Sequence, residues 1–200
     1  MFTGIIREIG RITAVMPAAG SLRVRVAASL ARELDVGDSV AVDGVCLTVT
    51  ARGEDDFIAD ISPTTMRLTT LGEIEPGRRV NLEPPLRPTD RLGGHWVTGH
   101  VDAVGTVLDR FQEGDVRHLV VGVPAGGRPY LVERGSIAVA GVSLTIVAVD
   151  ADAFRVTLIP HTLSVTTLGE LEPGARVNLE YDIVGKYVLR FADVWRDRAG

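Results

Sequence analysis

The sequence contains one cysteine, Cys46, in 200 residues. A single cysteine excludes an intrachain disulfide and is typical of proteins from a reducing compartment. The N-terminus lacks the basic start and apolar stretch of a signal peptide, and no apolar run approaches the length of a membrane span. We therefore expect a cytoplasmic protein with no membrane partner.

Positive charge is also scarce. The chain has 21 lysines and arginines against 26 acidic residues, a net charge of −5, and its arginines are scattered. Nucleic-acid binding normally needs a clustered positive surface, so we expect no nucleic-acid partner. The four histidines show no metal-ligand spacing, and we expect no metal. With 46% hydrophobic residues, 24% charged residues and only 5% aromatics, the composition is that of a globular chain of one or two domains.

The chain contains an internal repeat. Residues 39–83 align without a gap with residues 136–180, and 25 of the 45 positions are identical. Both copies end in Val-Asn-Leu-Glu. The segment Thr3-Gly4-Ile5 pairs in the same way with Thr98-Gly99-His100, which extends the duplication to the start of the chain. Two units of about 90 residues therefore form nearly everything before residue 181.

Each unit has the pattern of short strands. Runs of valine, isoleucine, leucine and threonine alternate with a period of two between Gly, Asp and Pro turns. Ser62 as N-cap and Pro63 at the first helical position predict a short helix that ends near Leu71-Gly72. Its counterpart begins near Pro160, and single turns are expected near Leu30–Leu34 and Tyr130–Glu133. We predict a mainly β protein with a small closed barrel in each unit, because closure removes exposed sheet edges.

The final segment follows a different pattern. From Ile183 to Trp195, apolar residues recur at three- and four-residue steps, which predicts an amphipathic helix. This helix either caps the second barrel of its own chain or packs against copies of itself. A proline-rich linker, Pro84–Asp90, separates the two units. We predict an N-terminal barrel over residues 1–90, a C-terminal barrel over 91–182 and a terminal helix over 183–200.

Several motifs, in this order, resemble one enzyme family. They are Met1–Ile5, Gly44–Thr48, Leu92–His95, Thr98–Asp102, Gly141–Thr145, Ile159–Thr162, Asn178–Asp182 and Lys186–Val188. Together with the duplication they are similar to the trimeric riboflavin synthases. The resemblance implies two similar six-stranded antiparallel barrels, a C-terminal helix that holds a homotrimer, and lumazine synthase as a partner.

The activity that the resemblance implies is a dismutation without a cofactor. One 6,7-dimethyl-8-ribityllumazine donates a four-carbon unit to another, giving riboflavin and 5-amino-6-ribitylaminouracil. In the family, the two substrates meet where the N-terminal barrel of one subunit faces the C-terminal barrel of its neighbour. The C7 methyl of the lumazine is acidic, so the protein mainly has to orient two rings and move protons.

The resemblance also implies two binding pockets, each completed by the start of the other repeat. The N-terminal pocket would use Cys46, Leu47, Thr48, Asp60, Ile61, Ser62, Pro63, Thr64, Thr65, Gly99, His100 and Val101. The C-terminal pocket would use Gly4, Ile5, Ile6, Arg134, Ser143, Leu144, Thr145, Ile159, Pro160, His161, Thr162, Leu163 and Ser164. Positions that the family associates with activity correspond to Phe2, Ser39, Cys46, His95, His100, Ser143 and Asp182.

These candidates also have simpler interpretations. His100 suits proton transfer, because the pKa of histidine lies near neutrality, but it can also be a structural turn residue. His95 can instead hold the linker. Cys46 can be a small buried apolar side chain. Because Ser143 stands at the position equivalent to Cys46, we interpret both as polar pocket groups rather than covalent nucleophiles.

Three residues depart from the family pattern. Ala140 replaces the usual aspartate, Arg134 the usual lysine and Thr64 the usual glutamate. An arginine keeps the charge of the lysine but does not readily shuttle protons. Two of these changes are expected near the C-terminal pocket. They leave a second hypothesis open, a non-catalytic lumazine- or flavin-binding paralogue.

Overall fold

A computed structural model describes residues 1–199 of the protein, with side chains as far as Arg196. The first repeat forms six strands: β1 (Glu8–Ala18), β2 (Ser21–Ala27), β3 (Ser39–Val42), β4 (Val45–Arg52), β5 (Asp56–Ile61) and β6 (Arg79–Glu83). They close into an antiparallel barrel in the order β1-β2-β5-β4-β3-β6.

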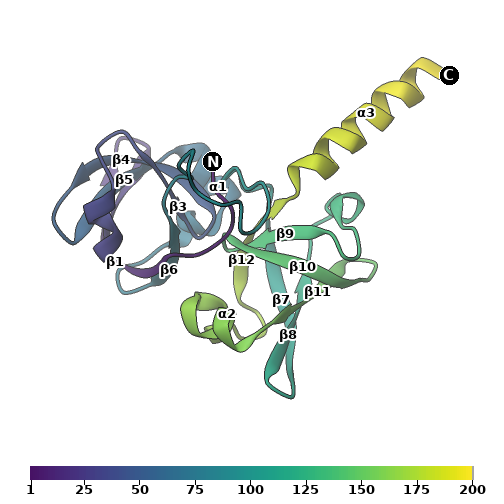
Figure 1. Cartoon of the computed structure of the whole chain (residues 1–200). Helices are drawn as coiled ribbons and strands as arrows, with labels where there is room; N and C mark the ends of the chain where they lie inside the picture. The colour runs from purple at the N-terminus through teal and green to yellow at the C-terminus, as the bar shows by residue number, and fades with distance from the viewer. Residues whose placement is uncertain (200) are drawn as a thin grey trace.

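The second repeat builds the same barrel. Its strands are β7 (Ala103–Glu113), β8 (Val116–Gly122), β9 (Ser136–Val139), β10 (Val142–Val149), β11 (Ala153–Leu158) and β12 (Arg176–Tyr181). They close in the order β10-β11-β8-β7-β12-β9, which is the equivalent arrangement (Figure 1). The predicted pair of six-stranded barrels is confirmed.

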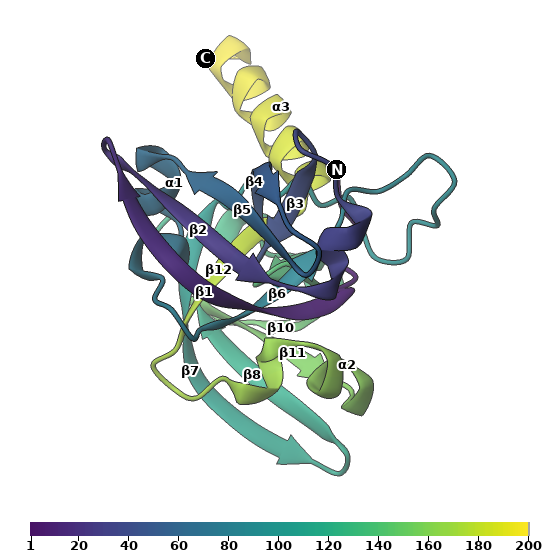
Figure 2. The same ribbon diagram turned by 90° about the vertical axis from the view of Figure 1, so that its left-hand side faces the viewer.

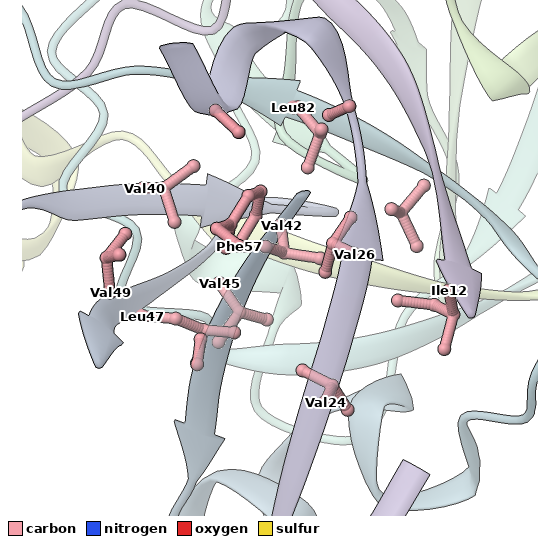
Figure 3. Close-up of a cluster of buried hydrophobic side chains, with 14 of the residues drawn as sticks. Ile12, Val24, Val26, Val40, Val42, Val45, Leu47, Val49, Phe57 and Leu82 are labelled. Carbon is pink, nitrogen blue, oxygen red and sulfur yellow. The ribbon is translucent and has the colours of Figure 1, made fainter. Parts of the chain in front are cut away.

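Alternating burial explains why these segments form closed barrels. Along β4, Val45, Leu47 and Val49 are buried, whereas Thr48 and Thr50 are exposed. The buried valines and leucines point into the barrel around Phe57 (Figure 3). Each fully buried side chain of this kind contributes about 1.5–3 kcal/mol, so the period-two pattern fixes which face turns inward.

Short helices follow the fifth strand of each barrel. Helix α1 (Pro63–Leu68) begins as predicted, with the Ser62 hydroxyl accepting the Thr65 N–H at 3.1 Å. The predicted end at Leu71-Gly72 is wrong, because Thr69 is extended and its hydroxyl accepts the Leu71 N–H. A separate 3₁₀ turn, η2 (Thr70–Glu73), follows.

The other short turns complete the two barrels. Helix α2 (Pro160–Val165) is followed by the 3₁₀ turn η4 (Thr167–Glu170). Turn η1 (Ser29–Glu33) lies where it was expected. Turn η3 (Arg128–Tyr130) begins before the predicted Tyr130–Glu133, because the backbone already turns at Gly127, whose N–H bonds the Pro124 carbonyl.

Helix α3 (Ile183–Ala199) extends away from both barrels (Figures 1 and 2). Its apolar side chains are more than half exposed: Val184, Tyr187, Val188, Phe191 and Trp195. The helix therefore does not cap its own barrel, and that alternative is wrong. Gly200, the last residue of the predicted tail, lies outside the described residues. Within residues 1–199, no helix is long and apolar enough to cross a membrane.

The two barrels contact each other through equivalent polar groups. The Asn81 side chain donates to the Ala140 carbonyl at 2.9 Å and accepts the Thr167 N–H at 2.8 Å. Asn178 makes the mirrored pair of bonds to Asp43 and Thr70, again at 2.9 and 2.8 Å. The ion pairs Arg79–Glu170 and Arg176–Glu73 also join the barrels. The repeats are thus related by an approximate twofold axis between Asn81 and Asn178.

Candidate functional site

The segments that precede the two barrels pair with each other. The N–H of Phe2 donates to the carbonyl of Val97 at 2.8 Å, and the N–H of Val97 donates back at 3.2 Å. Phe2 and Val97 are both buried, and Cys46 packs against the same small apolar cluster. This bridge places the start of each repeat between the barrels.

Beyond the bridge, each segment lies against the opposite barrel. The Ser143 N–H bonds the Gly4 carbonyl at 2.8 Å, and the Cys46 N–H bonds the Gly99 carbonyl at 2.9 Å. Both glycines have positive φ, 76° and 78°, and an added Cβ would lie 2.6 Å from the Ser143 Cβ or 2.5 Å from the Cys46 Cβ. Only glycine fits here. The start of the first repeat therefore adjoins β10, and the start of the second adjoins β4.

The first candidate site gathers residues of β4, β5 and α1 beneath the turn at Gly99. Cys46, on β4, is half-buried. His100, which follows Gly99 in the turn, is exposed. Asp60 lies near the end of β5, where Arg23 binds its carboxylate at 2.7 and 3.1 Å. That bidentate bond lowers the pKa of Asp60 and holds it charged.

The remaining residues predicted for this pocket follow in the chain. Leu47 and Ile61 point into the barrel core. The exposed hydroxyls are those of Thr48, Ser62 and Thr64, while Thr65 and Val101 are half-buried. The Thr64 hydroxyl accepts from Arg67 at 3.1 Å, so this departure from the family lies on the exposed surface of α1. Ser39 pairs with Thr48 across the β3–β4 ladder.

The second candidate site centres on Ser143 and His95. The Ser143 Oγ lies 2.7 Å from His95 Nδ1, and the backbone N–H of His95 donates to the Thr3 carbonyl at 3.1 Å. Burial lowers the pKa of His95, while the nearby Asp182 carboxylate partly opposes that shift. His95 is therefore neutral at neutral pH, and its buried Nε2 has no hydrogen-bond partner among residues 1–199.

Most of the other residues predicted for the second pocket belong to β10, α2 and the segments next to them. Leu144 is part of the core, and Thr145 is exposed on the same strand. Exposed residues are Ile5, Ile159, Pro160, His161 and Ser164, and half-buried ones are Ile6, Thr162 and Leu163. Arg134 is exposed, with φ 64°, in the turn before β9, where its N–H bonds the Ile146 carbonyl at 2.8 Å.

Both barrels match one known domain. The lumazine binding domain matches residues 3–84 and again residues 98–182. The riboflavin synthase of Mycobacterium tuberculosis (strain ATCC 25618 / H37Rv) is 43% identical over 195 residues, which cover 95% of this chain and 97% of that protein. The chain belongs to the riboflavin synthase family.

Other relatives agree with this placement. The riboflavin synthase of Actinobacillus pleuropneumoniae is 40% identical over 192 residues, covering 96% of this chain and 89% of that protein. Among solved structures, LumP complexed with 6,7-dimethyl-8-(1'-D-ribityl)lumazine has a TM-score of 0.82 at 28% identity, over 90% of this chain and 98% of that one. LumP complexed with riboflavin also has a TM-score of 0.82, at 30% identity over 90% of this chain and 99% of that one.

The structure corrects the expected place of Ala140, the residue that departs most from the family pattern. It lies in a cleft of about 600 Å³ between the barrels, together with Asp43, Arg78 and Ala175. In the first repeat the Asp43 carboxylate accepts from Arg78 at 3.4 Å. In the second repeat both partners are replaced at once, by Ala140 and Ala175. The carboxylate missing from the second repeat thus corresponds to a group that lines this cleft, whereas the side chain of Ser143 faces Gly4 and His95.

Two buried carboxylates beside the candidate sites were not predicted from the sequence. Glu83 and Glu180 are buried at the ends of β6 and β12, where they bind the segments that adjoin Ser143 and Cys46. The repeated Val-Asn-Leu-Glu could have indicated them, because an identical Asn and Glu inside two buried strands is an unusual pattern. Within residues 1–199, no group of three or more His, Cys, Asp or Glu side chains has the arrangement of a metal site.

Proposed function

We propose that this chain is a riboflavin synthase, which converts two molecules of 6,7-dimethyl-8-ribityllumazine into riboflavin and 5-amino-6-ribitylaminouracil. The observation that carries this function is 38–43% identity to riboflavin synthases over almost the whole chain. The reaction needs two copies of one substrate, and the duplicated barrel supplies two similar sites. The chemistry is a transfer of a four-carbon unit between the two lumazines.

The two sites differ in their proton-transfer groups, which suits a donor and an acceptor of the same compound. In the second site, neutral His95 with its proton on Nε2 accepts the Ser143 hydroxyl at Nδ1, 2.7 Å away. This bond makes the serine oxygen more basic, so Ser143 is the group of this pair that can exchange a proton with a bound lumazine. In the first site, Cys46 stands at the position equivalent to Ser143, and the exposed His100 stands where the second site has Ile5.

Sites that contain only weak bases fit the acidity of the C7 methyl. The protein then has to hold two ring systems in a reacting geometry and supply hydrogen bonds to the developing charge. The polar groups of both candidate sites lie at strand ends, where they are fixed by the barrels. We propose that the ring edges and ribityl hydroxyls bind these groups, including Asp60 and Ser62 in the first site.

We further propose a homotrimer held by α3. The exposed apolar face of this helix supports self-association, since Tyr187, Phe191 and Trp195 are large apolar groups left uncovered by their own chain. The functional units would then be the two barrels, 1–90 and 91–182, and the helix, 183–200. A cytoplasmic location and an association with lumazine synthase remain predictions of the family resemblance.

A binding protein without catalysis is the second candidate function. The likeness to LumP complexed with a lumazine and with riboflavin favours it. The identity to LumP is 28–30%, against 38–43% for the riboflavin synthases, so the enzyme is the better supported function.

One assay separates the two functions. The purified chain is incubated with 6,7-dimethyl-8-ribityllumazine, and riboflavin and the released pyrimidine are quantified together. The enzyme produces them in equal amounts over many turnovers. Stoichiometric binding with a fluorescence change and no pyrimidine would identify a binding protein instead.

A further inference from the structure

The carboxylates of Glu83 and Glu180 form two equivalent clamps on the backbone. Glu83 accepts the Thr3 N–H at 2.7 Å, the Thr3 hydroxyl at 2.8 Å and the Gly4 N–H at 2.9 Å. Glu180 accepts the Thr98 N–H, the Thr98 hydroxyl and the Gly99 N–H at 2.7, 2.6 and 2.8 Å. Both oxygens of each carboxylate are used. Charge-assisted bonds of this length are among the strong hydrogen bonds of proteins.

Each clamp reaches one residue further through the threonine. The Thr98 hydroxyl donates to Glu180 and accepts the His100 N–H at 3.3 Å, and Thr3 does the same for Ile5. One carboxylate therefore fixes three consecutive backbone groups. Because glycine is the most flexible residue, the Thr-Gly turn depends on these bonds for a single conformation.

The clamps act across the barrels. Glu180 lies next to the end of β12, the last strand of the second barrel, but holds the turn whose Gly99 carbonyl bonds Cys46 in the first barrel. Glu83 belongs to the first barrel and holds the turn that bonds Ser143 in the second. We propose that Glu180 positions His100 over the first site, and that Glu83 positions Ile5 over the second. The hydrogen-bond geometry does not depend on the proposed function, whereas its effect on turnover rests on the proposed riboflavin synthase function.

The single cysteine allows a direct test without activity. Cys46 lies under the turn held by Glu180, and its backbone N–H bonds the Gly99 carbonyl of that turn, so its reaction rate with a thiol reagent reports mainly on that turn. Glu180→Gln replaces one acceptor by an NH₂ group facing the Gly99 N–H, and Thr98→Val removes the hydroxyl link. Both should raise the rate at Cys46 roughly tenfold, since bonds to charged groups are lost and the turn opens. Thr98→Ser should restore the native rate.

Matched variants in the other clamp provide the control. Glu83→Gln and Thr3→Val make the same chemical changes but release the turn over Ser143, so the labelling of Cys46 should stay at the native rate. Thermal melting identifies any variant that fails to fold, and Thr98→Val then replaces Glu180→Gln in the comparison. Equal rates at Cys46 in the native chain and Thr98→Val, or an equal rise in the Glu83→Gln variant, would overturn the proposal.

Turnover tests the positioning role of Glu180. Glu180→Gln should lower kcat/KM by about tenfold or more, because small displacements of a catalytic group are costly. In a double-mutant cycle, Glu180→Gln should have little further effect once His100→Ala is present, whereas Glu83→Gln should act additively with His100→Ala. Additive effects of Glu180→Gln and His100→Ala would contradict positioning. An inactive native chain with intact labelling differences would refute the enzyme function and leave the clamps standing.

Discussion

At the scale of single residues, the contrast between Asp43 and Ala140 has a structural explanation. Both have φ 46° in the tight turns before β4 and β10. Aspartate tolerates this conformation better than alanine, and its carboxylate accepts the Asn81 N–H at 2.8 Å. The second repeat has lost the carboxylate together with its arginine partner, so no buried charge is left without a counterion there.

We expect Ala140→Asp to destabilise the protein rather than to improve it. A buried carboxylate at this position would face Ala175 instead of an arginine, at a cost of about 3 kcal/mol. The double variant Ala140→Asp, Ala175→Arg should recover a large part of that loss, because it rebuilds the ion pair of the first repeat. Urea unfolding measures both. Higher riboflavin formation by the single variant would show that Ala140 limits catalysis, contrary to its place in the cleft.

Asp43 should also make stability depend on pH. Burial raises the pKa of Asp43 to about 6, against the opposing effects of Arg78 and the Asn81 N–H. The folded state thus holds a proton that the unfolded chain releases near pH 4, and the contribution of this group falls as pH rises through 6. Relative to Asp43→Asn, the native chain should lose about 3 kcal/mol between about pH 4 and pH 7.

Denaturant titrations at several pH values check this expectation. Asp38→Asn is a suitable control, because Asp38 is a half-buried loop residue whose carboxylate accepts the nearby Asp35 N–H. The difference between Asp43→Asn and the native chain should grow with pH, while Asp38→Asn should not reproduce it. A constant difference would mean that Asp43 titrates in the same range folded and unfolded.

At the scale of elements, α3 is the part whose surroundings are least complete within one chain. Its base is held by Lys186, whose ammonium lies 2.6 Å from the Asp102 carboxylate, and by Asp182, which accepts the Val184 N–H. The apolar face beyond this base remains uncovered. A helix of this composition gains stability only when a second apolar surface covers it.

Truncation after Asp182 should convert the proposed trimer to monomers. Sedimentation velocity measures the change, and the two barrels should keep their own thermal transition. The milder variant Phe191→Glu should have the same effect, because a charge on the apolar face opposes burial. Arg196→Ser, a change at an exposed polar residue of the same helix, is the control. An unchanged trimer after truncation would exclude α3 as the contact that holds it.

The strands and helix starts could be predicted from local chemistry. Period-two apolar runs located the barrels, and Ser62-Pro63 located the start of α1. The helix end could not be predicted, because it depends on the Thr69 hydroxyl capturing the Leu71 N–H in an extended residue. The exposure of α3 also could not, since an amphipathic pattern shows that a face will be buried but not by which surface.

At the scale of the whole molecule, the polar contact across the approximate twofold axis couples the two barrels. The sequence contains only two asparagines, Asn81 and Asn178, and both bridge this contact with side-chain bonds in each direction. Buried amides that lose their partners leave unsatisfied groups, which makes such networks sensitive to substitution.

We expect the double variant Asn81→Ala, Asn178→Ala to unfold in two separate calorimetric transitions. The native chain should unfold in one, because each barrel stabilises the other through these bonds and the two Arg–Glu pairs. The single variants Asn81→Ala and Asn178→Ala should have effects similar to each other, because the two contacts are equivalent. Gln112→Ala, which removes an exposed amide, is the control. A single sharp transition in the double variant would show that the apolar contacts alone couple the barrels.

The arrangement of the candidate sites across the twofold axis could not be predicted from the sequence. The repeat pairs Thr3-Gly4 with Thr98-Gly99, but nothing in the spacing shows that each turn adjoins the opposite barrel. That placement follows from the Phe2–Val97 bridge, a contact between residues 95 positions apart. The clamps likewise join Glu83 to Thr3, 80 positions away, and such long-range partners have no local pattern.

The two tryptophans lie at the proposed ligand site and at the proposed trimer contact. Trp96 stands between His95 and Val97 beside the candidate sites, and Trp195 lies on the uncovered face of α3, and both indoles are more than half exposed. Intrinsic emission therefore contains two independent signals. Trp96→Phe leaves an optical reporter of assembly, and Trp195→Phe leaves one of ligand capture, so both events can be followed in one cuvette without an added dye.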